Sequence, residues 1–170
     1  MGYWGLFIIV MLAGVVIQST LQGKFAKYSK VSLKYGYTGA DIARKMMQDN
    51  GITDVKVECI EGTLTDHYNP STKTVNLSKK VYYGSSVAAA AVAAHECGHV
   101  VQHAVGYAPL KLRSALVPVV SFANNTVQWI LLLGMLMIKT FPTLLWIGIA
   151  LFAMTTLFSF VTLPVEINAS

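Results

Sequence analysis

Charged residues are scarce in this chain of 170 residues, where they make up 12%, against about 25% in soluble domains. Cysteine is scarce too, and Cys59 and Cys97 are too few for a disulfide framework, so both are expected to be reduced thiols. The lysines neither form a run nor alternate with aromatics, so the net charge of +5 does not indicate a nucleic-acid partner. Hydrophobic residues reach 54%, which favours a membrane protein.

Three uncharged apolar stretches predict transmembrane helices, at residues 3–20, 114–138 and 144–163. At about 1.5 Å of rise per residue, each comes close to the roughly 30 Å thickness of the hydrocarbon layer. The first is interpreted as an uncleaved signal anchor, because no basic residue precedes it and no small-residue cleavage site follows. The short break at 139–142 makes the other two a transmembrane hairpin.

Basic residues near the ends of these stretches predict the orientation in the cell membrane. Six lie on one side and one, Lys139, lies on the other. Because cytoplasmic loops are enriched in lysine and arginine, we expect the segment between the first two spans to be cytoplasmic and the N-terminus to be outside. The six are Lys24, Lys27, Lys30, Lys34, Lys111 and Arg113.

The cytoplasmic segment carries signals for both helices and strands. Thr38 and Asp41 predict a capped helix that ends at Asn50. The other predicted elements are strands at about 55–60, 64–68 and 74–77, of which the last two form a hairpin, and a helix from Ser85 or Ser86 to Val105, ended by Gly106.

These elements predict an α-helical multi-pass membrane protein with a small α+β, zincin-like cytoplasmic domain. The expected organisation is an N-terminal transmembrane helix (1–23), a cytoplasmic domain (24–113), a transmembrane hairpin (114–163) and a short segment with the third metal ligand (164–170).

A metal motif, His95-Glu96-Cys97-Gly98-His99, lies within the long predicted helix. Residues four apart on a helix are separated by about 40° around its axis, so both imidazoles can reach one ion. Catalytic zinc leaves a coordination position for water, whose proton Glu96 can accept. The pattern predicts one Zn²⁺ per chain, bound by His95 and His99, with Glu96 as general base. His103 continues the same stripe but is too far along the helix to be an easy third ligand.

Peptidase zinc sites need a third protein ligand. Glu166 is the best candidate, because it follows the last span on the side predicted for the histidines. The full set of candidates is Glu58, Glu61, Glu166, Asp66, His67 and His103.

The zinc motif, the stretch Leu64-Thr65-Asp66-His67-Tyr68 and the final Leu163-Pro164-Val165-Glu166-Ile167-Asn168-Ala169-Ser170 together resemble the YugP-like membrane zinc metallopeptidases over nearly the whole chain. That family is similar to the gluzincins, which implies Glu166 as the third ligand and Ser170 as a support for a zinc histidine. The same resemblance implies that the strand Thr74, Val75, Asn76 and Leu77 pairs with an extended substrate. Family members continue beyond the position of Ser170, so a truncated chain is expected.

The predicted function is therefore hydrolysis of peptide bonds in a peptide or protein substrate, by a zinc-activated water with Glu96 as base. Tyr68, His103 and Tyr107 remain open as donors to the oxyanion. Two alternatives remain open, one that keeps the enzyme class but changes the place of the site and one that is non-catalytic. The zinc helix itself could cross the membrane, since Glu96 is the only charge in residues 81–110, although the basic residues that follow argue against it. A non-catalytic adaptor with structural zinc would normally use four protein ligands. The sequence does not predict the oligomeric state.

Overall fold

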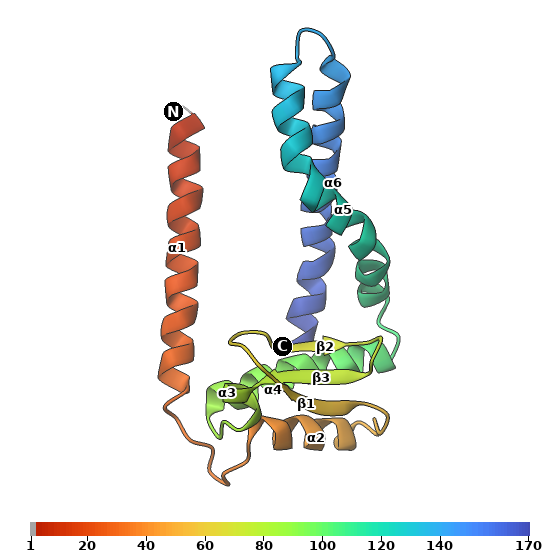
Figure 1. Ribbon diagram of the computed structural model, residues 1–170. Coiled ribbons are helices and arrows are strands. Elements are labelled where there is room, and N and C mark those ends of the chain that lie inside the picture. The colour runs from red at the N-terminus through yellow and green to blue at the C-terminus, as the bar shows by residue number, and fades with distance from the viewer. Residues whose placement is uncertain (1–2) are drawn as a thin grey trace. The chain divides into compact units, whose positions relative to one another are not determined.

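The computed structural model describes residues 3–170, and most of them are helical, with one small sheet (Figure 1). The chain divides into two compact units, one up to Val100 and one from Val101. The division falls within helix α4 (Val87–Ala104), inside the segment 24–113 that the sequence analysis treats as one domain. Each unit is described by itself.

Within residues 3–170, three helices are long and apolar enough to cross a membrane, as predicted: α1 (Tyr3–Tyr28), α5 (Ala108–Leu136) and α6 (Pro142–Ala169). All three extend beyond the apolar stretches. Four of the six basic residues that border the first two stretches therefore lie within the helices: Lys24 and Lys27 in α1, and Lys111 and Arg113 in α5. The final segment 164–170 is not separate either, because α6 runs through Pro164 to Ala169 and carries Glu166 in its last turns.

In the second unit, α5 and α6 pack closely against each other through glycine. A Cβ atom at Gly134 would lie 2.8 Å from Cα of Leu145, and one at Gly148 would lie 2.7 Å from Cδ2 of Leu131. Small residues allow such close backbone approach where no hydrophobic effect drives helices together in lipid. The pair has the short connection expected of a hairpin, with α6 beginning at Pro142.

The first unit contains a three-stranded sheet in the order β1-β3-β2. Strand β1 (Lys56–Ile60) is parallel to β3 (Thr74–Ser78), whereas β2 (His67–Asn69) is antiparallel to it. The predicted hairpin is present, and the Asn69 side chain accepts hydrogen bonds from the backbone of the next residues in its turn. Strand β2 begins later than predicted, because Leu64 has a φ of 59°, which is incompatible with an extended strand.

The core of this unit lies where α2 (Gly39–Asp49), β3 and α4 meet. All five residues of β3 are buried, as expected for a central strand. Alanines such as Ala93 let α4 approach closely, and Cys97 is fully buried beside them. The buried cluster consists of Ala43, Met47, Val75, Leu77, Val81, Ala89, Ala93, Cys97 and Val100. Burial of this apolar surface fixes one face of α4, so the opposite face is left for the histidines.

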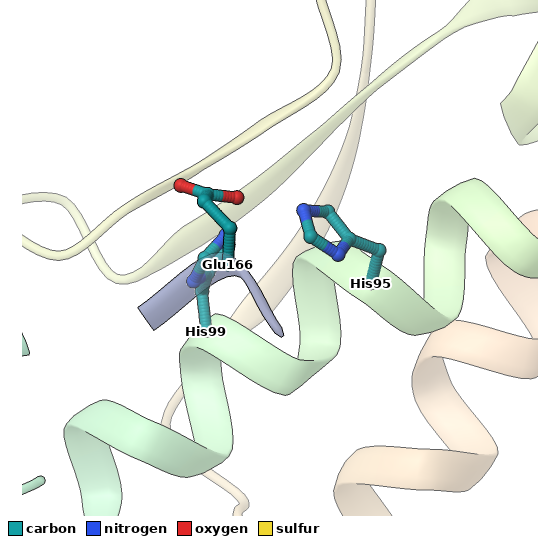
Figure 2. Close-up of side chains that lie close together, drawn as sticks. All are labelled: His95, His99 and Glu166. Atoms are coloured by element: carbon teal, nitrogen blue, oxygen red, sulfur yellow. The ribbon is translucent and has the colours of Figure 1, made fainter. Parts of the chain in front are cut away.

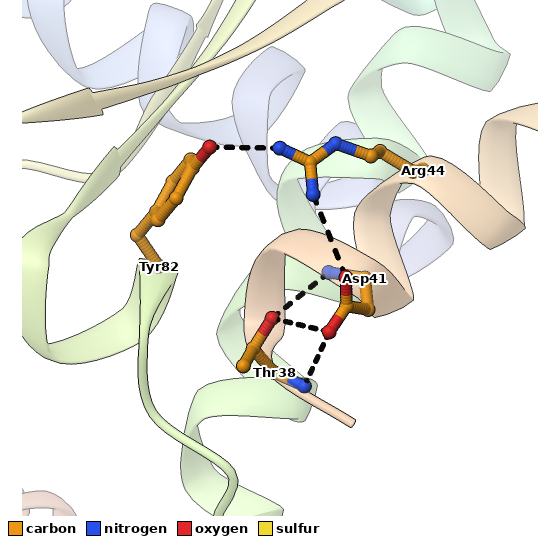
Figure 3. A network of polar contacts seen from close by, with 4 residues as sticks. All are labelled: Thr38, Asp41, Arg44 and Tyr82. Carbon is orange, nitrogen blue, oxygen red and sulfur yellow. Dashed lines mark hydrogen bonds and ion pairs between the residues drawn. The ribbon is translucent and has the colours of Figure 1, made fainter. Parts of the chain in front are cut away.

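A polar network at the start of α2 connects it to the short helix α3 (Lys79–Tyr82) (Figure 3). The predicted capping box is present: Asp41 N donates to Oγ1 of Thr38 at 3.2 Å, and Thr38 N donates to the Asp41 carboxylate at 3.0 Å. The Thr38 hydroxyl also donates to the Asp41 carboxylate, at 2.7 Å, and this bond, the one from Thr38 N and the charge of Arg44 lower the pKa of Asp41. Arg44 also donates to the Tyr82 hydroxyl at 2.7 Å. The network fixes how α2 enters the core.

Candidate metal centre

Helix α4 supplies the metal motif, and its ends match the predicted signals. Ser86 Oγ accepts a hydrogen bond from the Ala89 backbone at 3.2 Å, which satisfies one of the free N–H groups of the first turn. At the other end, Gly106 adopts a φ of 67°, and its N–H donates to the carbonyl of His103. The motif thus lies in the interior of a regular 18-residue helix.

His95 and His99 point from the same side of α4. Their ring centroids are 4.8 Å apart and their planes are inclined at 77°, as expected for residues one turn apart. His99 is only 9% exposed, whereas His95 is partly accessible. The helical spacing therefore brings two imidazole nitrogens close enough to serve one ion.

Glu96, the proposed base, is 9% exposed and is oriented by the sheet. Its Oε2 accepts a hydrogen bond of 3.1 Å from the backbone N–H of Tyr68 in β2. Burial raises the pKa of Glu96, while the charges of His95 and His99 and the hydrogen bond from Tyr68 act in the opposite direction. A carboxylate with a raised pKa is a stronger base than an exposed one, which suits proton transfer near neutral pH.

One group of side chains within residues 3–170 has the composition of a metal site: His95, His99 and Glu166 (Figure 2). Each offers one ligand atom, and these atoms lie within 4.8 Å of one another. Glu166 is the one candidate third ligand from the sequence that belongs to this group. In the second unit, its Oε1 also lies 3.4 Å from Nη1 of Arg113, and both side chains are about one-third exposed. That ion pair was not predicted.

The other candidate residues have different environments. His103 is exposed, and Tyr107 precedes α5. Ser170 Oγ donates to the backbone carbonyl of Glu166 at 3.0 Å. Burial raises the pKa of the Tyr68 hydroxyl. The charge of Asp54 raises this pKa further, whereas that of Lys73 lowers it. A neutral phenol is a hydrogen-bond donor, but no contact to a substrate is defined, so these roles stay predictions.

The predicted pairing of residues 74–77 with a substrate is wrong. Strand β3 is central, and its two edges are already paired with β1 and β2. Just beyond the short β2, Asp66 accepts a hydrogen bond of 2.7 Å from the backbone of Ser78, which occupies the rest of that edge. The strand order, which the sequence does not reveal, decides this point. The strand at the edge nearest Glu96 is β2.

Comparison with known proteins agrees with this geometry. Residues 3–170 match the family model described as "putative neutral zinc metallopeptidase". The chain is also 44% identical over 169 residues to the "putative membrane protease YugP" of Bacillus subtilis (strain 168). The match covers 97% of this chain and 74% of that relative. The chain belongs to this zinc metallopeptidase family. No solved structure matches it.

The zinc that this metallopeptidase family implies fits the side chains present. Two imidazoles and one carboxylate form a known catalytic donor set. In the group of three, the ligand atoms lie within 4.8 Å of one another. This donor set fits a zinc ion that keeps a fourth coordination position open.

The cysteine inside the motif has no part in this donor set. Cys97 points into the core, where its Sγ lies 3.6 Å from the carbonyl oxygen of Ala43, and burial raises the pKa of its thiol to about 12. Because the thiolate is the reactive form, Cys97 should resist alkylation of the folded protein at pH 8, whereas partly exposed Cys59 should react. Peptide mass analysis checks this, with denatured protein as the control in which both thiols react. Rapid labelling of Cys97 in folded protein would contradict its burial.

Sequence reasoning missed two groups that the structure brings to the site region. The backbone N–H of Tyr68 orients Glu96, and the amide of Gln102 contacts the end of α6. The sequence did contain a signal for Gln102. After the motif, Gln102 and His103 are the two polar residues among the apolar residues of Val100–Val105. The contact from Tyr68 to Glu96 depends on strand order, which the sequence does not indicate.

Proposed function

We propose that this chain is a membrane-bound, zinc-dependent peptidase that hydrolyses peptide bonds with Glu96 as general base. The observation that supports it most is the convergence of ligand atoms from His95, His99 and Glu166 beside a buried, oriented carboxylate. Membership of a zinc metallopeptidase family supports the same chemistry. The group offers three protein ligands rather than the four usual for structural zinc, which favours an enzyme over an adaptor.

In this proposal, His95, His99 and Glu166 hold one zinc ion per chain. A bound zinc ion would supply Lewis-acid polarisation of the substrate carbonyl and a water of lowered pKa. Glu96 accepts the proton of the attacking water and then delivers it to the leaving amine. The hydrogen bond from Tyr68 N–H keeps the Glu96 carboxylate in one orientation during both transfers.

We further propose that the motif helix lies outside the lipid. Its buried face, with Ala93, Cys97 and Val100, packs in the same core as β3, and α4 is not among the helices long and apolar enough to span a membrane. An intramembrane site would carry the sheet, with its edge strands β1 and β2, into lipid, at a cost of several kcal/mol for each unsatisfied backbone group. The excess of basic residues at the ends of α1 and α5 favours the cytoplasmic side.

The function is tested by purifying the full chain in detergent and measuring zinc and proteolysis together. We expect close to one zinc per chain and cleavage of an unfolded test protein, such as reduced casein, which a chelator stops and added zinc restores. Tight zinc binding without any cleavage of several unfolded substrates would favour the adaptor. Cleavage that persists after complete removal of metal would contradict the proposal.

The orientation is tested with single cysteines introduced at exposed positions, in a background without Cys59 and Cys97. In intact cells, a membrane-impermeant thiol reagent should label Lys139→Cys and not Lys34→Cys. Permeabilised cells, in which both should be labelled, provide the control. The opposite pattern would place the metal motif outside the cell.

A further inference from the structure

Gln102 is buried against the end of α6, in the second unit. It is 3% exposed, and its Nε2 donates two hydrogen bonds, of 2.8 Å to the backbone oxygen of Val165 and of 2.9 Å to Oδ1 of Asn168. The two acceptors flank Glu166, one residue before it and two residues after it. A single amide thus contacts the turn of α6 that carries the carboxylate.

The position of Gln102 on α4 connects this contact to the metal motif. Gln102 follows His99 by three residues, and residues three apart on a helix are neighbours on its surface. Helix α4 therefore also contacts, through Gln102, the backbone oxygen of Val165 before Glu166 and the side chain of Asn168 after it. No other glutamine of the chain lies within this helix.

The last turn of α6 needs such a contact because Pro164 weakens its connection to the rest of the helix. Proline has no backbone N–H, so the carbonyl of Phe160, four residues earlier, lacks its usual helical donor. The turn that follows contains Glu166 and ends at Ala169, close to the helix terminus where backbone bonds fray. Hydrogen bonds from a buried side chain restrict this turn more than a contact in water would.

We propose that Gln102 is a positioning residue for the third zinc ligand, a role that rests on the proposed function. Gln102 does not bind the metal. Its two hydrogen bonds fix the turn that carries Glu166, so that the carboxylate meets the ion without first being ordered. Side chains that orient metal ligands typically contribute about 10–100-fold to metal affinity.

The test is zinc affinity, measured by competition with a chelator on the full chain in detergent. Gln102→Leu keeps the size of the side chain and removes the donor, and is expected to weaken zinc binding about 10–100-fold. Gln128→Leu, the same change at an exposed position of α5, is the matched control and should bind zinc as the unmodified protein does. Cobalt substituted for zinc provides a second readout, because its visible spectrum changes when the carboxylate leaves the coordination sphere.

Combination with Glu166→Ala separates positioning from general stability. If Gln102 acts through Glu166, then Gln102→Leu should have little further effect on zinc affinity once Glu166 is absent. Additive losses in the double variant, or an unchanged affinity and cobalt spectrum in Gln102→Leu, would overturn the inference. If Gln102→Leu does not fold, Asn168→Ala removes one acceptor and should weaken zinc binding about twofold to tenfold, whereas Asn168→Asp keeps the acceptor and should not. Equal affinities for these two would also overturn it.

The same measurements distinguish this inference from the proposed function. If Glu166→Ala binds zinc as tightly as the unmodified protein, the proposed ligand set fails, and the role of Gln102 fails with it. If Glu166→Ala weakens binding but Gln102→Leu does not, only the positioning role is lost.

Discussion

Replacing Glu96 with Gln is expected to reduce peptide hydrolysis by about 10²–10⁴-fold, the usual contribution of a positioned general base. The amide has nearly the same shape as the carboxylate, and its oxygen can still accept the 3.1 Å hydrogen bond from Tyr68 N–H. What it cannot do is accept a proton from water. The loss should therefore appear in kcat, with zinc content unchanged.

The measurement is steady-state cleavage of a test protein together with zinc analysis of the same preparation. Glu58→Gln makes the same chemical change at an exposed position of strand β1, outside the metal group, and should retain full activity. Unchanged cleavage by Glu96→Gln would eliminate its role as base. A loss of zinc as well as activity would instead assign Glu96 to metal binding.

Removing the carboxylate of Glu166 should have the largest effect on the metal itself. Glu166→Ala leaves two imidazoles as protein ligands and is expected to weaken zinc binding by more than the roughly 10–100-fold typical of residues that only orient a ligand. It also leaves the cation of Arg113, now 3.4 Å from the carboxylate, unneutralised close to the ion. Both effects act in the same direction, and hydrolysis should be lost with the metal.

Arg113→Met separates these two effects, since it removes the ion pair and keeps the ligand. The pair is about one-third exposed, and such pairs contribute about 0–1 kcal/mol. Its zinc affinity should therefore change much less than that of Glu166→Ala. Chelator competition on both variants measures the difference. Unchanged zinc binding by Glu166→Ala would direct the search to Asp66, His67 or His103.

Local pattern predicted the parts of this protein that depend on near neighbours in sequence. The four-residue spacing of His95 and His99 fixes their relation on any α-helix, and the structure has that relation. The capping box at Thr38 and the helix end at Gly106 likewise depend on side chains and backbone within a few residues. Three apolar helices follow from composition alone.

Contacts between distant segments were beyond such patterns. The sequence indicates strands but not their order, so the central position of β3 and the hydrogen bond from Tyr68 to Glu96 could not be derived. The last span was predicted to end at Leu163, whereas α6 continues to Ala169, and its final turn is contacted by the hydrogen bond from Gln102 to Val165. Tertiary contacts commonly override a local propensity of this size.

Helix α6 combines two features: it is long and apolar enough to cross a bilayer, and it carries Glu166 near its end. Deleting one residue between Pro142 and Leu163 would shorten the helix by about 1.5 Å and rotate its C-terminal end by about 100° about the axis. Lipid would tolerate the shortening, but the carboxylate would face another direction. If Glu166 is the third zinc ligand as proposed, insertions and deletions that an ordinary membrane anchor tolerates should displace that ligand, so zinc binding as well as bilayer thickness would constrain the length of α6.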